Sequence, residues 1–390
     1  MSIEVEEKIT GLTEAQQRGN GLRTEHMVLN MGPQHPSTHG VLRLELELEG
    51  EIIKKVIPHI GYLHRCFEKY TEAKTYPQIV PYVDRMDYLA SMYNEFGYAV
   101  AVEKLLGIQV PERVDYIRVI MGELQRIASH LVALGTYGMD IGAFTPFLYC
   151  FRDREKILNL FEITCGARLL YNYIWVGGLS HDIHPDFVRL TKEFVTYFRP
   201  NIKELNDLLT NNKIFIDRTA NVGILPKETA INFGISGPNL RASGFKWDLR
   251  KDDTYSVYNK FDFDIPIGQG LMGTVGDCWD RYYLRVQEME QSLRIIEQAI
   301  DQIPEGDVTS AIPKRIKPPV GQVYSRVENP RGELGYFIMS NGGTNPFRVK
   351  VKGPSFVHLG IMDELSRGHM VADIIAILGS IDIVLGEVDR

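Results

Sequence analysis

Helical periodicity is the feature that most constrains this sequence. Apolar residues recur at three- and four-residue steps through several long stretches, and glycines or prolines end most of them. One stretch begins at Thr145-Pro146, a good N-cap followed by proline at the first helical position. Long amphipathic helices that follow one another with short connections predict a bundle. The predicted helices cover residues 84–106, 111–138, 145–173, 185–209 and 277–303.

Alternating apolar and polar residues predict small antiparallel sheets in addition to this bundle. Residues 24–57 alternate around a turn at Glu49-Gly50-Glu51, and residues 333–352 alternate again before a last short helix from His369 to Leu378. The predicted fold class is therefore α+β with a central bundle of long helices. The predicted regions are a flexible N-terminal arm (1–20), an N-terminal α+β region (21–83), the helical bundle (84–212), an irregular glycine-rich region (213–276), a further bundle helix (277–303) and a C-terminal α+β region (304–390).

One loop concentrates chemically active side chains. Residues 32–40 read Gly-Pro-Gln-His-Pro-Ser-Thr-His-Gly, and their glycines and prolines cannot continue a helix or a central strand. A strand predicted from Val41 to Leu48 follows and anchors the loop. Such a loop is stiff enough to hold a ligand, although the same polar groups could instead hydrogen-bond to one another in a turn.

Composition argues against several classes of function. The 390 residues are 44% hydrophobic and 24% charged, which is typical of a globular protein that buries a core. A net charge of −7 without a basic stripe gives no reason to expect nucleic acid as a partner. Apolar runs such as 374–378 are too short to cross a bilayer, and the first residues lack the features of a signal peptide. We therefore expect a cytoplasmic chain that another protein holds at any membrane where it works.

Local patterns give little support to a metal or nucleotide site. The four cysteines include no C-x-x-C pair, so they are predicted to be reduced thiols without a cluster or zinc. His35 and His39 are four residues apart, but Pro36 prevents the helix on which they would share a face. Residues 268–273 match G-x-G-x-x-G, yet no βα unit precedes them. We therefore favour a flexible turn there over a dinucleotide site.

Acidic residues stand near two predicted helix ends. Asp84 is explained by helix capping, whereas Asp140 lies in a predicted loop between Gly138 and Gly142, where it could face a partner histidine. Other charged residues of the predicted helices are interpreted as ion pairs and satisfied core polar groups rather than catalysts: Glu123, His130, Arg152, Arg154 and Glu155.

Five motifs in order along the chain resemble one family. They are the 32–40 loop, Gly-Tyr-Leu-His-Arg-x-x-Glu-Lys at 61–69, Asp-Arg-Met-Asp-Tyr at 84–88, Pro-Arg-Gly-Glu-Leu-Gly at 330–335 and the closing segment 379–390. From about residue 24 to residue 390, the sequence resembles the 49-kDa-type subunit (the D subunit) of the proton-pumping NADH:quinone oxidoreductases, respiratory complex I. The order and number of the motifs argue strongly against chance agreement.

The resemblance implies a fold similar to the large subunit of nickel–iron hydrogenases. In that protein two C-x-x-C pairs hold the metal, and the matching positions here are Asp87 with Ala90 and Val384 with Glu387. None of the four is a thiol, so the soft ligands that hydrogenase chemistry needs are missing. We therefore expect no metal or cluster bound by this chain, and an active hydrogenase is rejected as a function.

The resemblance assigns the emptied cavity to the headgroup of a quinone substrate, ubiquinone or menaquinone. His39 and Tyr88 are implied to bind its two carbonyl oxygens, Asp140 to orient His39, and Asp382 to lie in the same cavity. A quinone that gains two electrons needs two protons, and it needs donors at the oxygens where negative charge develops. A neutral phenol and an imidazole whose pKa is raised by a carboxylate are such donors.

The resemblance also implies partners. Electrons would come from the terminal iron–sulfur cluster of the cluster-bearing B subunit, against which Arg65 would lie and tune the cluster electrostatically. The C and I subunits and the membrane-embedded H subunit are the other implied neighbours. The chain is thus expected in the peripheral arm, on the cytoplasmic side of the inner membrane, coupled to proton translocation and inactive in isolation.

The chain departs from the family pattern at two places, and two alternatives stay open. Members often carry a histidine two residues after the arginine that matches Arg168, where this chain has Leu170, so the redox role given to that histidine is in doubt. The segment before Gly321 is shorter than in many relatives. Electrons could come from NADH, ferredoxin or a deazaflavin. A non-catalytic assembly scaffold with the same fold is the alternative function.

Overall fold

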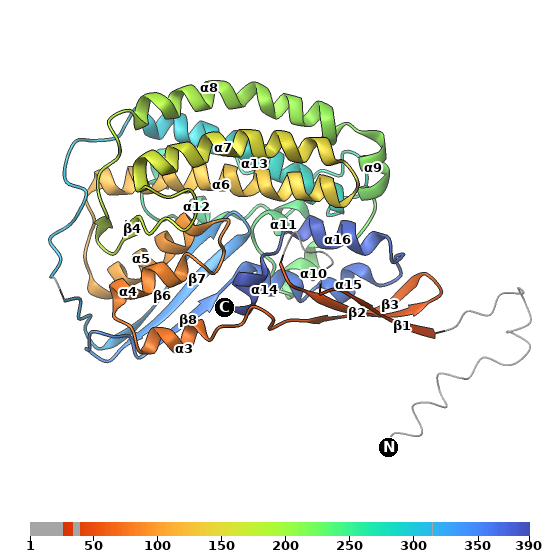
Figure 1. Cartoon of the computed structure of the whole chain (residues 1–390), viewed down its shortest axis with the longest axis horizontal. Helices are drawn as coiled ribbons and strands as arrows, with labels where there is room; N and C mark the ends of the chain where they lie inside the picture. Colours follow the sequence, from red (N-terminus) through yellow and green to blue (C-terminus); the bar gives the residue numbers. More distant parts are fainter. Residues whose placement is uncertain (1–25, 34–39, 314) are drawn as a thin grey trace, which may run out of the picture.

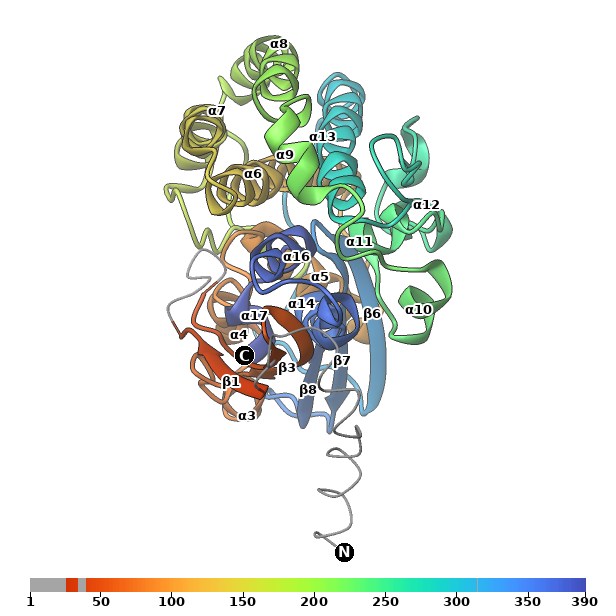
Figure 2. The ribbon, with the colours of Figure 1, turned by 90° about the vertical axis from the view of Figure 1, so that its right-hand side faces the viewer.

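The computed structural model describes residues 26–33, 40–313 and 315–390. Its long helices form the upper half of the molecule in Figure 1, and Figure 2 shows them end-on as a bundle. Their apolar faces share one core that includes Ile120, Leu131 and Met289. The predicted bundle is therefore confirmed. Its helices are α6 (Glu112–Asp140), α7 (Phe144–Cys165), α8 (Phe187–Leu205, continued by a π-helical turn at Asn206–Thr210) and α13 (Cys278–Ile300).

Antiparallel sheets lie below the bundle, as the alternating patterns predict. In the first sheet, Leu44, Leu46 and Leu48 of one strand all face the core, because side chains alternate between the two faces of a strand. The second sheet lies next to α5 (Ser91–Leu106) (Figure 1). The first sheet has the order β1 (His26–Met31), β2 (Arg43–Glu49), β3 (Ile52–His59), and the second has the order β6 (Gly321–Asn329), β7 (Gly332–Ser340), β8 (Arg348–Lys352). A short hairpin pairs β4 (Ile174–Trp175) with β5 (Gly178–Leu179).

The C-terminal helices fill the space between the first sheet and the bundle (Figures 1 and 2). Ile377 and Leu385 from these helices share a hydrophobic core with the leucines of β2. This packing brings the end of the chain back to its beginning. The helices concerned are α14 (Pro354–Leu359), α15 (Met362–Ser366), α16 (Asp373–Ile381) and α17 (Leu385–Asp389).

Short helices connect the larger elements. The region predicted to be irregular, 213–276, contains several of them and no strand of its own. Its G-x-G-x-x-G segment is a bend before α13, and the Gly270 amide donates to Asp280 Oδ2 at 2.9 Å. The turn predicted there is confirmed. The short helices are α3 (Phe67–Glu72), α4 (Tyr76–Val83), α9 (Lys213–Thr219), α10 (Lys227–Asn232), α11 (Gly237–Ala242), α12 (Leu249–Asp252) and a 3-10 turn (Tyr258–Lys260).

The first predicted helix is wrong at its start. Residues 76–83 already form α4, with Pro77 in its first turn and Pro81 inside it, and α5 begins only at Ser91. Proline is tolerated in a first helical turn because the first amides of a helix lack intrahelical acceptors anyway. Asp84 therefore ends α4 instead of capping α5, whose N-cap is Ala90.

The second predicted helix is longer than expected. Gly135 and Gly138 lie inside α6, which runs to Asp140, so the prediction of a loop at Asp140 is wrong. A Cβ at Gly135 would come within 3.1 Å of Cys150 Cβ, and a Cβ at Gly138 would come within 3.2 Å of Leu209. These glycines permit close helix packing, which local sequence reasoning misread as a stop.

Three other boundaries differ from the predictions. Helix α7 ends at Cys165 and not near residue 173, because Gly166 takes the left-handed conformation that closes a helix. Helix α16 runs from Asp373 to Ile381 and not from 369 to 378. Strand β6 was not predicted at all. Within the described ranges, no helix combines the length and the apolar character that a membrane crossing requires.

Candidate functional site

Three segments that are far apart in sequence meet beneath the bundle. A Cβ at Gly386 would come within 2.6 Å of the Met86 carbonyl oxygen and 3.4 Å of the Tyr88 ring. A Cβ at Gly40 would likewise come within 3.0 Å of the Leu385 side chain. Glycine at 386 thus lets the start of α17 pack directly on the turn that carries Tyr88. The same short helix contacts Gly40, at the end of the histidine-bearing loop.

A buried ion-pair cluster lies next to this contact. Arg331, in the turn between β6 and β7, donates to Asp87 Oδ2 at 2.7 Å and lies 3.4 Å from Asp382 Oδ1. It also donates to Ser129 Oγ of α6 at 3.2 Å. Arg285 of α13 lies 3.7 Å from the second Asp382 oxygen. All five side chains are buried, so the cluster ties the turn before α5 to the bundle and to the segment after α16.

Burial is the largest influence on the pKa values of Asp87 and Glu387, two acids of this region. It raises the pKa of Asp87, an effect that the Arg331 guanidinium opposes and the Asp382 charge reinforces. Burial, with help from the Asp87 charge, also raises the pKa of Glu387 in α17 to about 7. Glu387 Oε2 accepts a hydrogen bond from the Ser355 amide at 2.9 Å. A carboxyl with a pKa near 7 can gain or lose a proton at working pH.

Among the described residues of this region, His358 is a neutral histidine. Burial lowers the pKa of His358 to about 3, and its Nδ1 lies 3.0 Å from Asn239 Nδ2. The Asn239 amide also donates to the Ile381 carbonyl at 2.9 Å and accepts from Arg285 at 3.0 Å. His358 is therefore an acceptor in a polar chain that positions Arg285, while the arginines supply the positive charge.

A second buried ionic network stiffens the bundle above the site. Burial alone would raise the pKa of Glu123, but Arg126 and Arg250, each 3.2 Å away, lower it to about 2. His130 pairs with Glu288 at 2.9 Å. The interpretation of Glu123 as a satisfied core group is confirmed, whereas His130 is paired only through Nε2, since its buried Nδ1 has no hydrogen-bond partner among the described residues. Ion pairs also explain two of the other predicted charges, Arg152 with Asp153 and Glu204, and Glu155 with Arg168.

Tyr88 is a half-buried phenol in the turn between α4 and α5. Burial, followed by the charge of Asp87, raises the pKa of this phenol above its ordinary value. The hydroxyl therefore stays protonated at neutral pH and can donate a hydrogen bond. The position of Tyr88 beside Gly386 fits the quinone-binding role that the resemblance implies.

Of the other residues predicted at the site, Asp140 and Asp382 are described by the structure and His39 is not. His39 lies outside the described residues, so its spacing from Tyr88 stays a prediction. Asp140 is half-buried at the end of α6. Helix α16 links this end of α6 to the cluster. Gly379 of α16 is three residues before Asp382, and a Cβ at Gly379 would come within 2.5 Å of the Tyr137 ring of α6. Arg331 thus links the turn that carries Tyr88 to Asp382, because it binds both Asp87 and Asp382, and it also contacts Ser129 of α6.

Arg65 belongs to the exposed segment that leads into α3. Its guanidinium donates to the Arg85 carbonyl, which connects it to the turn between α4 and α5. Asp389 of α17 fixes the same segment, because its carboxylate accepts from the Gly61 amide at 2.8 Å and the Leu63 amide at 2.7 Å. Large apolar side chains near Arg65 in the sequence are also exposed, namely Ile60, Tyr62, Tyr70 and Tyr82.

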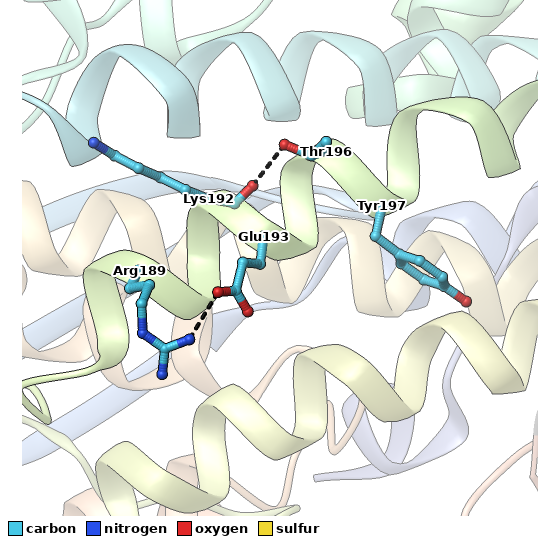
Figure 3. A pocket seen from close by; sticks show the side chains of 5 residues that line it. All are labelled: Arg189, Lys192, Glu193, Thr196 and Tyr197. Carbon is cyan, nitrogen blue, oxygen red and sulfur yellow. Dashed lines mark hydrogen bonds and ion pairs between the residues drawn. The ribbon is translucent and has the colours of Figure 1, made fainter.

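A wide groove elsewhere on the surface carries no comparable chemistry. It has a volume of about 490 Å³ and lies along α8, in the outer helix layer at the top of Figure 1. Figure 3 shows two interactions among its side chains, with Arg189 donating to Glu193 and Thr196 to the Lys192 carbonyl. Lys192 also pairs with Asp301, and Tyr197 donates to Asp153. This groove is formed by a different part of the chain from the Tyr88 turn.

Sequence reasoning missed the anchoring residues of the cluster. Arg331 lies in one of the motifs that carry the resemblance, but no role followed from the motif alone. Arg285 lies in a helix among many other charged residues and carries no local signal. A signal was available for Asp87 and Glu387, because the resemblance aligns both with the ligand positions of hydrogenases. Among residues 26–33, 40–313 and 315–390, no group of three or more His, Cys, Asp or Glu side chains is arranged to hold a metal.

Comparison with known proteins identifies the class of the chain. Residues 140–318 and 310–390 match the family described as the 49 Kd subunit of respiratory-chain NADH dehydrogenase. The chain is similar to the NADH-quinone oxidoreductase D subunit of Chlorobaculum tepidum, with 60% identity over 373 residues, 95% of this chain and 93% of the relative. The corresponding protein of Cytophaga hutchinsonii is 56% identical over 379 residues, 95% of this chain and 97% of the relative.

The chain therefore belongs to the 49 Kd (D) subunit family of NADH-quinone oxidoreductase, respiratory complex I. This confirms the resemblance, and the mixture of helices with small antiparallel sheets confirms the α+β class. As a member of this family, the chain is one component of an oxidoreductase complex, and its partners are other subunits of that complex.

Proposed function

We propose that this chain forms part of the site where complex I reduces its quinone. The observation that carries the proposal is the meeting of Gly40, Tyr88 and the 385–387 segment beside the buried Asp87–Arg331 pair. It supports the proposal because the protonated Tyr88 phenol lies on a turn that is held in place by the packing of α17 and by the Arg331–Asp87 ion pair. A fixed donor needs no reorganisation when charge develops on a substrate oxygen.

In this proposal the chain's own residues bind the quinone headgroup and supply hydrogen bonds. Tyr88 donates to one carbonyl oxygen of the headgroup. His39, outside the described residues, donates to the other, with Asp140 as its orienting carboxylate. Reduction takes up two electrons and two protons, and the two donors lie where negative charge grows during that step. Asp382 acts through Arg331 on the Tyr88 turn.

Electrons reach this site from another protein of the complex in our proposal. The exposed segment with Arg65 and the apolar side chains around it is a suitable surface for the cluster-bearing B subunit and its terminal iron–sulfur cluster. We also propose the C, I and H subunits as neighbours, a peripheral position on the cytoplasmic side of the inner membrane, and coupling to proton translocation. NADH is the proposed donor to the complex, because the relatives are named for it.

Replacement of Tyr88 by phenylalanine tests the proposal. The variant Tyr88→Phe keeps the ring and removes the hydroxyl, so quinone reduction by the assembled complex should fall by about 10²–10³-fold. Tyr283→Phe is the matched control, because Tyr283 lies in α13 and stacks on Trp279, a contact that phenylalanine keeps, so the rate should stay unchanged. Both complexes should keep wild-type electron transfer to an artificial acceptor that bypasses the quinone.

A different outcome would favour the alternative function. Unchanged quinone turnover in the Tyr88→Phe complex, with normal assembly, would indicate a scaffold that holds other subunits in place. A ferredoxin- or deazaflavin-dependent complex would instead retain the effect of Tyr88→Phe but fail to oxidise NADH.

A further inference from the structure

Two carboxyl groups with no described function are buried together at the two ends of the Tyr88 turn. Asp84 closes α4, and Glu95 lies in the second turn of α5. Both side chains are 0% exposed. The chain between them carries Tyr88, so any link between the two carboxyls also closes the loop on which Tyr88 stands.

Each carboxyl binds the same neighbouring segment through one of its oxygens. Asp84 Oδ2 accepts from the Asn172 amide at 3.0 Å. Glu95 Oε2 accepts from the Tyr173 amide at 2.9 Å and from the Ile174 amide at 2.6 Å. Three successive backbone amides at the start of β4 are therefore held by two acids.

The second oxygens of the two acids have no donor. Among the described residues, neither Asp84 Oδ1 nor Glu95 Oε1 has a hydrogen-bond partner, although both atoms are buried. The two side chains lie side by side, because the amides that they bind are consecutive, and each carboxyl influences the pKa of the other. Two carboxylates could only repel there, whereas a proton on one of them would satisfy both oxygens at once. The missing partner at this site is thus a proton.

No cation among the described residues forms an ion pair with either acid, in contrast to Asp87 and Glu123. Asp87 is paired with Arg331, and Glu123 with two arginines, whereas neither Asp84 nor Glu95 forms an ion pair with a described residue. Arg85 is exposed, and its guanidinium donates to the Pro81 carbonyl. It favours the charged form of Asp84 without contacting it. The uncompensated charge and the burial both favour keeping one proton.

We propose that Asp84 and Glu95 share one proton at neutral pH, and that this proton fastens the 172–174 segment to both ends of the turn that carries Tyr88. The pair is a proton-binding site and acts on the quinone site as a positioning device. Loss of the proton would leave two adjacent buried carboxylates, whose repulsion would open the turn. The effect on quinone reduction rests on the role proposed for Tyr88, but the proton itself does not.

The other titratable groups around the pair do not replace the proton. Burial raises the pKa of each phenol and of the thiol nearby, so these groups are neutral at working pH and add no charge. Arg85 is a charged neighbour of the pair, and it opposes protonation of Asp84. The groups that face the pair are Arg85, Cys165, Tyr171, Tyr173 and Tyr336.

The sign of the pH dependence follows from the direction of the shift. Burial, with the Asp84 charge, raises the pKa of Glu95 well above its ordinary value. A raised pKa in the folded chain means that the contribution of the pair is present at lower pH and is lost as the pH rises through the shifted pKa. We therefore expect an alkaline limit to quinone reduction, with a fall of up to about tenfold per pH unit above that pKa.

The experiment compares wild type, Glu95→Gln and Glu95→Ala in the assembled complex between pH 6 and pH 10. A glutamine amide supplies a permanent N–H to Asp84, so Glu95→Gln should keep the pH 7 rate within about twofold and remove the alkaline fall. Alanine supplies no donor or acceptor, so Glu95→Ala should lower the rate at every pH. An alkaline fall in Glu95→Gln equal to that of wild type would overturn the positioning role.

Infrared spectroscopy on the purified full chain separates this proposal from the proposed function. At neutral pH the wild-type spectrum should contain the C=O stretch of a protonated carboxyl that disappears in Glu95→Gln. Absence of that band in wild type would overturn the shared proton, whether or not Tyr88 binds quinone. If the band is present but Tyr88→Phe leaves quinone turnover unchanged, then the proposed function fails and the proton site stands.

Discussion

Arg331 gives the most direct test of the buried cluster. Its guanidinium holds Asp87 at 2.7 Å and Asp382 at 3.4 Å, and its side chain is 0% exposed. The variant Arg331→Met keeps much of the volume but leaves two buried acids near each other without their shared cation. Removal of one partner from a buried ion pair costs about 3–5 kcal/mol. We expect the free energy of unfolding in urea at pH 7.5 to fall by that amount, a large part of the stability of an ordinary domain.

The pH dependence of this loss checks its cause. Burial already raises the pKa of Asp87, and without the guanidinium the pKa should rise further. Below that pKa the acid is neutral and no charge is stranded, so the difference between variant and wild type should shrink toward pH 5 and grow with pH. Adding Asp87→Asn and Asp382→Asn to Arg331→Met should restore about 2 kcal/mol or more, because the stranded charges are then removed.

A matched arginine serves as the control. Arg348 of β8 pairs with Glu68 and Glu72 at the surface, so Arg348→Met should cost less than about 1 kcal/mol. If Arg331→Met costs no more than the control, or if its effect is the same at pH 5 and pH 8, then the cluster does not stabilise the turn electrostatically and the reasoning is refuted.

Two further predictions concern α17. The raised pKa of Glu387, about 7, means that its contribution to stability is present below the ordinary carboxyl range and is lost as the pH passes through 7. Glu387→Gln should therefore flatten the fall in unfolding free energy between about pH 4.5 and pH 7, by at most about 1.4 kcal/mol per pH unit, because one proton is involved. Asp389→Ala should release the amides of Gly61 and Leu63, which hydrogen-exchange mass spectrometry of that segment would detect as faster exchange. Unchanged exchange there would mean that Asp389 does not hold the segment that carries Arg65.

Local patterns predicted the elements of this fold well where the elements depend on local energetics. The apolar spacing from Val114 to Leu134 predicted α6, and the alternation from Val41 to Leu48 predicted β2 with its leucines buried. In both cases the pattern records which face of one element is removed from water. The Glu49-Gly50-Glu51 turn followed from the same logic, because glycine permits the left-handed conformation found at Gly50.

The predicted helix boundaries were wrong where packing against distant residues outweighed the local sequence pattern. Gly135 and Gly138 normally indicate a helix end, but in α6 they allow Cys150 and Leu209 to approach the helix, so the helix continues to Asp140. Asp84 has the position of a cap, yet it is buried and binds the amide of Asn172. Neither kind of contact can be predicted from the few residues on either side of these positions.

The sequence by itself determined the helical bundle, the small sheets and, through its motifs, the family to which the chain belongs. It did so because helix and strand periodicity and motif spacing are properties of neighbouring residues. Only the tertiary structure decided which charges meet: Arg331 binds an acid 244 residues away, whereas the buried Asp84 and Glu95 have no ion pair with any described residue. The electrostatics of a buried group depend on every segment packed against it, and no local stretch of sequence records that environment.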